Sequence, residues 1–235
     1  MTAASPGSIN RTARLAGVLY LLLAVLGFFS FGYIPRTLFV PGNAAATTRN
    51  ILESEALFRA GTVSHLVSQI VVVFLVLALY RIFEPANRNL AVLMVVFALL
   101  CVPISFLSEL NHFAALRVLS PNGDPGFTAS QPQTEAMLFL DLRRTGVLLA
   151  QIFWGFWLLA LGAVILQAHF LPRLLTIPVV IAGAGYLLDS GTQLLFPGLP
   201  TISQFTALGE MVLPLWLLIR GVAVERWQHA FAART

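Results

Sequence analysis

Five ionisable side chains stand inside long apolar stretches of the sequence, where charge is costly. They are Glu109, Asp189, Glu210, His65 and His112. Ionisable groups within membrane segments are rare, and they mark ligand sites, proton pathways or buried ion pairs. Their chemistry therefore restricts this chain to binding a ligand, carrying protons, holding a metal or haem, or fixing helices by ion pairing.

The metal and haem hypotheses depend on three of these residues. Glu109-x-x-His112 places a carboxylate and an imidazole on one face of a helix, and His65 could add a third ligand. A second Glu-x-x-His pair, as helical carboxylate sites use, is lacking, and no closed set of four ligands is evident. We therefore predict no cofactor and keep an intramembrane metal- or haem-dependent enzyme as an alternative.

Other enzyme classes leave no trace in the sequence. It contains no G-x-S-x-G, no H-E-x-x-H, no phosphate-binding loop and no G-x-G-x-x-G. The functional prediction therefore leans away from an enzyme.

The elements that position these residues are long apolar segments. Of the 235 residues 58% are hydrophobic and 10% charged, and the mean hydropathy is +0.85. An apolar run of about 20 residues crosses a bilayer as a helix. Pro103, Pro178 and Pro214 lie inside predicted spans and favour kinks. The sequence predicts an all-α membrane protein, a single domain over residues 1–235 with about six spans, at approximately 15–34, 61–83, 90–116, 145–168, 174–196 and 205–224.

One shorter helix is predicted outside the spans. Asn43 is suited to cap a helix that runs to about Arg59, and Gly61 is suited to end it.

The basic residues are all arginines, and they indicate topology rather than a nucleic-acid partner. They are scattered between apolar runs and form no basic stripe. Short cytoplasmic loops are enriched in basic residues, so both termini are predicted in the cytoplasm. The inner side then holds Arg11, Arg14, Arg81, Arg88, Arg173, Arg220, Arg226 and Arg234, and the outer side holds Arg36, Arg49, Arg59, Arg117, Arg143 and Arg144.

With this topology, polar side chains from five spans lie in the outer half of the bundle. We expect them to form a site that binds or moves a small or lipid-like ligand. The predicted site residues are His65, Gln69, Glu109, His112, Arg144, Gln151, Asp189, Gln193 and Glu210.

A structural role explains the same residues differently. Arg143 and Arg144 could neutralise the buried carboxylates and fix helix register. Dense ion pairing without a cavity would favour a structural or stress-related partner protein that has no ligand. The sequence leaves the oligomeric state open.

Four segments resemble one known family. They are RLAGVLYLLLAV (Arg14–Val25), TTRNILESEALFR (Thr47–Arg59), LYRIFEPANRNLA (Leu79–Ala91) and FLPRLLTIPVVIAGAGYLLDS (Phe170–Ser190). They are similar to the bacterial membrane family named domain of unknown function 4386, and the likeness extends from about Arg11 to Val224. The resemblance implies a multi-pass protein of the bacterial cytoplasmic (inner) membrane, and it implies no activity and no catalytic residue.

Overall fold

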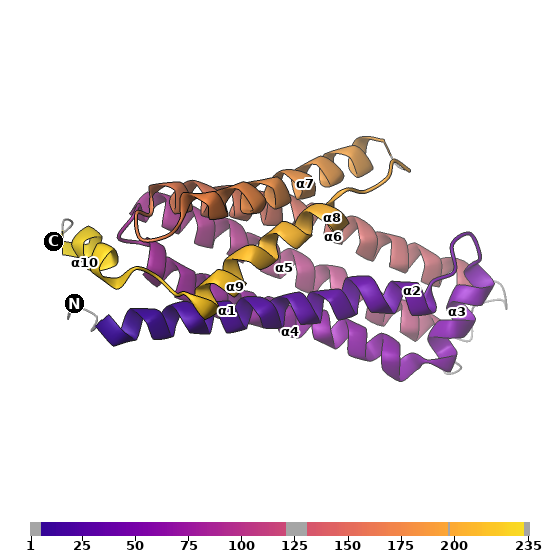
Figure 1. Ribbon diagram of the computed structural model, residues 1–235. Coiled ribbons are helices and arrows are strands. Elements are labelled where there is room, and N and C mark those ends of the chain that lie inside the picture. Colours follow the sequence, from indigo (N-terminus) through magenta and orange to yellow (C-terminus); the bar gives the residue numbers. More distant parts are fainter. Residues whose placement is uncertain (1–5, 121–130, 197, 233–235) are drawn as a thin grey trace.

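The structure is a bundle of long helices that cross a membrane several times. The computed structural model describes residues 6–120, 131–196 and 198–232, and every regular element within them is a helix (Figure 1). Within these residues five helices are long and apolar enough to span a bilayer, and the number is six if a bent pair of helices near the C-terminus is counted as one span. The chain is thus an all-α membrane protein.

The first five spans are continuous or nearly continuous helices. The first extends over Ser8–Leu38 and consists of α1 (Pro6–Gly27), a π-helical turn η1 (Phe28–Tyr33) and α2 (Ile34–Leu38). The next four are α4 (Glu55–Phe83), α5 (Arg88–Leu119), α6 (Gln131–Gln167) and α7 (Thr176–Leu195), the last preceded by the 3-10 turn η2 (Arg173–Leu175). Their lengths fit the roughly 20 residues that a membrane crossing requires.

The sixth apolar segment is broken. It consists of α8 (Ser203–Thr206), a 3-10 segment η3 (Ala207–Met211) and α9 (Val212–Ile219). Gly221, at φ +65°, supplies the left-handed residue that ends α9. The short helix α10 (Val224–Ala232) then leaves at 95°. The predicted span 205–224 therefore corresponds to a segment that stops at Ile219.

Two of the three prolines lie near the start of a helix. Pro178 and Pro214 occupy the first turns of α7 and α9, close to the junctions with the 3-10 segments η2 and η3 that precede these helices. Pro103 lies in the interior of α5 and removes a helical hydrogen bond there.

The helix predicted from Asn43 is shorter than expected. Asn43 does cap α3 (Ala44–Glu53), because its side chain accepts a hydrogen bond from Ala46 N at 2.9 Å. The helix ends at Glu53, and α4 then runs unbroken through Gly61. The prediction that Gly61 ends a helix was wrong, because Gly61 lies inside α4. Its lack of a side chain lets α4 pack closely against Ile34.

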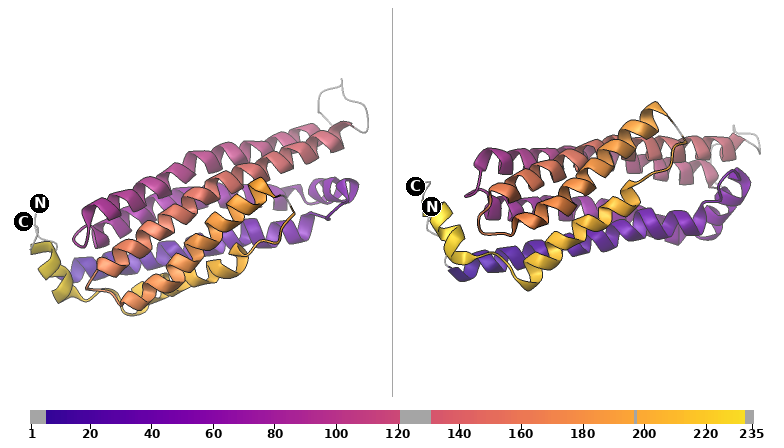
Figure 2. Two further views of the ribbon diagram at one scale, coloured as in Figure 1. Left: turned by 90° about the horizontal axis from the view of Figure 1, so that it is seen from above. Right: turned by 45° about the horizontal axis from the view of Figure 1, so that its top comes forward.

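The helices form a closed ring in chain order. Each long helix packs on its neighbours, from α1 through α4, α5, α6 and α7 to the sixth segment, which returns to α1. Both termini lie at one end of the bundle and α3 lies at the other (Figures 1 and 2). We call these the terminal end and the α3 end.

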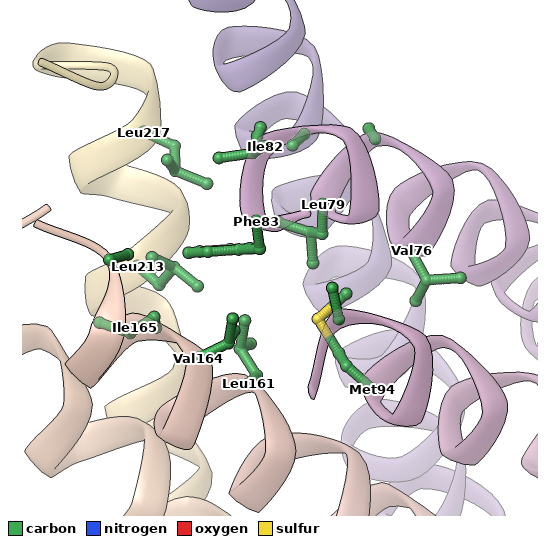
Figure 3. Close-up of a cluster of buried hydrophobic side chains, with 14 of the residues drawn as sticks. Val76, Leu79, Ile82, Phe83, Met94, Leu161, Val164, Ile165, Leu213 and Leu217 are labelled. Carbon is green, nitrogen blue, oxygen red and sulfur yellow. The ribbon is translucent and has the colours of Figure 1, made fainter. Parts of the chain in front are cut away.

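The inside of the ring is apolar near the terminal end. Side chains from α4, α5, α6 and α9 meet there (Figure 3), among them Leu79, Phe83, Met94, Leu161 and Leu213. A smaller apolar cluster fills the α3 end, with Ile34, Ile51, Phe58, Leu116 and Leu140 among its members. Polar side chains lie between the two clusters.

Apolar side chains also cover the outer surface. On α4 they form a stripe at helical spacing: Val63, Val67, Ile70, Phe74 and Leu77 are all exposed. A water-soluble monomer would not expose so continuous an apolar surface, whereas lipid solvates it.

Candidate functional site

Two neighbouring helices direct polar stripes into the ring. On α4 the buried polar residues include Thr62, His65 and Gln69; on α5 they include Ser105, Glu109 and His112. Spacings of three and four residues keep each set on one helix face. The sequence thus turns polar groups inward and apolar groups toward lipid.

Glu109 is the centre of the largest polar cluster. Its side chain is 1% exposed, and its Oε1 accepts hydrogen bonds from Arg143 Nε at 2.9 Å and Nη2 at 2.8 Å. His65 Nδ1 lies 2.6 Å from the same oxygen. Arg143 comes from α6 and His65 from α4, so their contacts with Glu109 of α5 link three consecutive spans. We call Glu109, Arg143, His65 and His112 the Glu109 cluster.

His112 approaches the other carboxylate oxygen. Its Nδ1 lies 3.0 Å from Glu109 Oε2 and 3.0 Å from Thr62 Oγ1. Only the threonine contact has hydrogen-bond geometry, and Oε2 is left without a hydrogen bond. The Thr62 hydroxyl donates its one proton to Phe58 O. The hydrogen bond between Thr62 Oγ1 and His112 Nδ1 therefore uses a proton on Nδ1.

The two imidazoles therefore present the same unused atom. A carboxylate only accepts, so His65 also carries its proton on Nδ1. In a neutral ring with this tautomer Nε2 has a lone pair, and both Nε2 atoms are buried without a hydrogen-bond partner. The residues His65 and His112 are 1% and 4% exposed.

The irregular turn η1 borders this cluster. In an α-helix the carbonyl of Phe31 would accept from residue 35, but Pro35 has no N–H. The turn widens instead, and Ile34 N–H bonds to Phe29 O, five residues back. Phe31 then packs edge-on against His65, with ring centroids 4.7 Å apart, and 5.1 Å under the Arg143 guanidinium.

A second group of predicted residues holds the start of the sixth segment. Asp189 accepts from Ile202 N at 2.9 Å and Ser203 N at 2.7 Å. Gln151 donates to Ser203 Oγ at 3.2 Å. Gln193 accepts from Arg144 at 3.1 Å and donates to Leu199 O. These bonds satisfy backbone groups that a broken helix would leave unpaired in the membrane.

Glu210 belongs to neither group. Its carboxyl is buried within η3 and accepts a hydrogen bond from Tyr20 OH at 2.8 Å. Tyr186 of α7 lies beside it as a second hydroxyl partner. Gln69 is also separate, because its amide contacts Ser68 Oγ at 3.1 Å and the Cys101 thiol.

The structure thus brings together His65, Glu109 and His112, but it divides the predicted outer site into separate groups. Within the described residues, no three His, Cys, Asp or Glu side chains are arranged to hold a metal ion. The Nδ1 atoms of both histidines already face Glu109 or Thr62, so only their Nε2 atoms could bind one. The metal hypothesis gains no geometric support.

Two surface pockets lie elsewhere. One of about 490 Å³, at the terminal end, is lined by Gln167, His169 and Arg173 among others. The other, of about 440 Å³, lies between α3, the end of α5 and the start of α6. No predicted site residue lines either pocket.

Sequence reasoning left several residues out of the site. Arg143 was considered only as a counter-charge, although it directly contacts Glu109. Tyr20, Thr62 and Phe31 were not considered. The signal that could have found Thr62 is the inward stripe it shares with His65 on α4. No sequence pattern places Tyr20 beside Glu210, because 190 residues separate them.

Comparison with known proteins agrees with the architecture. An uncharacterised protein of the archaeon Archaeoglobus fulgidus is 28% identical over 145 residues, which cover 61% of this chain and 73% of that protein. No solved structure matches. Residues 15–221 match the family described as Domain of unknown function (DUF4386). This chain, a multi-pass membrane protein, belongs to that family.

Proposed function

We propose that this protein binds, and by binding can move, a small polar or lipid-like ligand at the Glu109 cluster. The observation that carries the proposal is the pair of buried imidazole Nε2 atoms, on His65 and His112, that have no partner. A buried polar atom without a hydrogen bond costs about 1–3 kcal/mol. Two such atoms beside one carboxylate are better explained by a ligand than by packing.

The geometry also favours one ligand chemistry. When both rings are neutral and carry their proton on Nδ1, each Nε2 is an acceptor, so the ligand supplies donors. Hydroxyl and amino groups are such donors, and many lipid head groups and small solutes contain them. Glu109 Oε2, also without a hydrogen bond, is a third acceptor in the same cluster.

The irregular backbone around the polar groups supports a functional role. The π-helical turn η1 borders the Glu109 cluster through Phe31, and the 3-10 segment η3 contains Glu210. Such segments inside otherwise α-helical spans occur often at functional sites and hinges. Membrane proteins tolerate them where protein or a polar cavity surrounds them.

The arginine distribution supports an orientation. We place both termini in the cytoplasm, because Arg81, Arg88 and Arg173 flank two tight turns at the terminal end. The α3 end then faces outward, and the ligand reaches the cluster from the outer leaflet of the cytoplasmic membrane.

Native mass spectrometry of the gently solubilised protein tests the proposal. We expect a stoichiometric additional mass on the wild type. The double variant His65→Asn/His112→Asn keeps an amide donor near each Nδ1 position but removes both Nε2 atoms, and it should lose that mass.

The matched control is His169→Asn, at the terminal end of the bundle. It should keep the additional mass. A wild type without any additional mass, or a double variant that retains it, would count against a ligand at the cluster.

A structural role is the second candidate. Its supporting observation is that Arg143 already neutralises Glu109 and that neither pocket reaches the cluster. Under this hypothesis the cluster only holds α4, α5 and α6 in register. The double histidine variant would then lose stability, and the wild type would have the mass of the polypeptide alone.

A further inference from the structure

Glu210 is a buried carboxyl group without a counter-cation. The residue is 8% exposed, and its Oε2 accepts from Tyr20 OH at 2.8 Å. Among the described residues, the acidic partners in ion pairs are Glu53, Glu55, Glu84 and Glu109. Glu210 is not one of them.

The elements around Glu210 offer no cation. η3 packs against α7, α8 and α9, and Tyr20 reaches it from α1. From α7 come the Tyr186 hydroxyl and, farther along, Asp189, whose oxygens already accept two backbone N–H groups. Neither α8 nor α9 contains an ionisable residue, and the arginines of α1, Arg11 and Arg14, are exposed.

The immediate surroundings are aromatic. Tyr20 is stacked on Trp157 with centroids 5.8 Å apart, and Tyr186 packs edge-on against Trp154 at 5.8 Å. An anionic carboxylate among such side chains would be stabilised only by hydroxyl donors. Burial of a charge without a partner is far more costly than burial of a neutral, hydrogen-bonded acid.

We propose that Glu210 is a proton-binding site within the membrane and that it holds its proton in this conformation. Binding joins one proton from water to the carboxylate and gives the neutral acid, and release reverses that step. A proton needs no cavity, which suits a group packed among large aromatic rings. The site is separate from the Glu109 cluster and does not depend on the ligand proposed there.

The position of Glu210 gives the proton a way to affect the structure. The group lies in the 3-10 segment that interrupts the sixth span, and Gly209 packs on the backbone of Pro178 in α7. Loss of the proton would place an unpaired charge at this junction. Conformations of the broken span that admit water to the carboxylate would then become more stable relative to the present one.

Infrared spectroscopy of the full-length protein in lipid nanodiscs at neutral pH tests this proposal. A protonated, hydrogen-bonded carboxylic acid has a C=O stretching band apart from that of a carboxylate. We expect the band in the wild type and its loss in Glu210→Gln, which keeps the size and polarity of the side chain.

The matched control is Glu109→Gln. Glu109 is also buried but is paired with Arg143, so this variant should leave the band unchanged. Tyr20→Phe removes the donor to Glu210 and should shift the band to higher frequency without abolishing it. The wild-type spectrum tests the proposal even if a variant misfolds, because absence of the band in the wild type would overturn it. A band that survives in Glu210→Gln would overturn the proposal as well.

Discussion

At the residue scale, the central interaction is a buried ion pair between Glu109 and Arg143. One carboxylate oxygen accepts two guanidinium hydrogen bonds and faces the His65 ring, all within a membrane-spanning bundle. Such a pair adds little net stability compared with apolar packing, but removal of one partner leaves an unpaired buried charge. Replacement of either Glu109 or Arg143 alone is therefore expected to destabilise the bundle.

We expect Arg143→Leu to lower the free energy of unfolding by about 3–5 kcal/mol, because it leaves the buried Glu109 carboxylate without its counter-charge. Thermal or denaturant unfolding in detergent, followed by circular dichroism, measures the change. Arg144→Leu is the matched control, since Arg144 is the next residue, is exposed, and donates to the neutral Gln193. If both variants were destabilised equally, Glu109 and Arg143 would not form the pair described here.

At the element scale, α6 and α7 cross at a pair of glycines. A side chain at Gly155 would meet the carbonyl oxygen of Gly183, and a side chain at Gly183 would meet that of Gly155. Small residues let membrane helices approach closely, and backbone contacts cannot relax by a change of rotamer. This crossing holds Asp189 and Gln151 near the start of the sixth segment.

Alanine at Gly155 or Gly183 should therefore push the two helices apart. We expect a loss of about 1–3 kcal/mol, typical of overpacking, in the same unfolding measurement. Gly191→Ala, also on α7, has no atom within 4 Å of the added carbon and should be neutral or slightly stabilising. An equal effect at Gly191 would mean that helix propensity and not helix contact determines the result.

At the scale of the whole molecule, the sequence predicted the class of fold and the approximate place of the spans better than it predicted the site. Apolar length alone identifies helices such as α4 and α5, because lipid imposes that pattern. The separation of Glu210 from Glu109 could not be predicted, since it depends on which helices are neighbours in the ring. Nor could the break at η3, where Gly209 packs against the backbone of Pro178 in α7.

The ring also predicts where the two ends of the chain lie. With the broken segment counted as the sixth crossing, α10 returns to the side where α1 begins, and it packs there through Trp227, whose indole donates to Ile82 O at 2.9 Å. Reporter fusions at the two termini should report the same side of the membrane. A tag inserted at Gly42, between α2 and α3, should report the opposite side. Termini on opposite sides would contradict the sixth crossing.

The state of the two buried imidazoles is the most direct test of the ligand-binding account. The chain has four histidines, and nitrogen-15 NMR of histidine-labelled protein in lipid distinguishes the protonated from the unprotonated ring nitrogens. We predict a proton on Nδ1 and none on Nε2 in both His65 and His112, assigned by loss of signal in His65→Asn and His112→Asn. Exposed His169 and His229 serve as references. A proton on Nε2 of either buried ring would contradict the claim that these atoms are acceptors for a ligand.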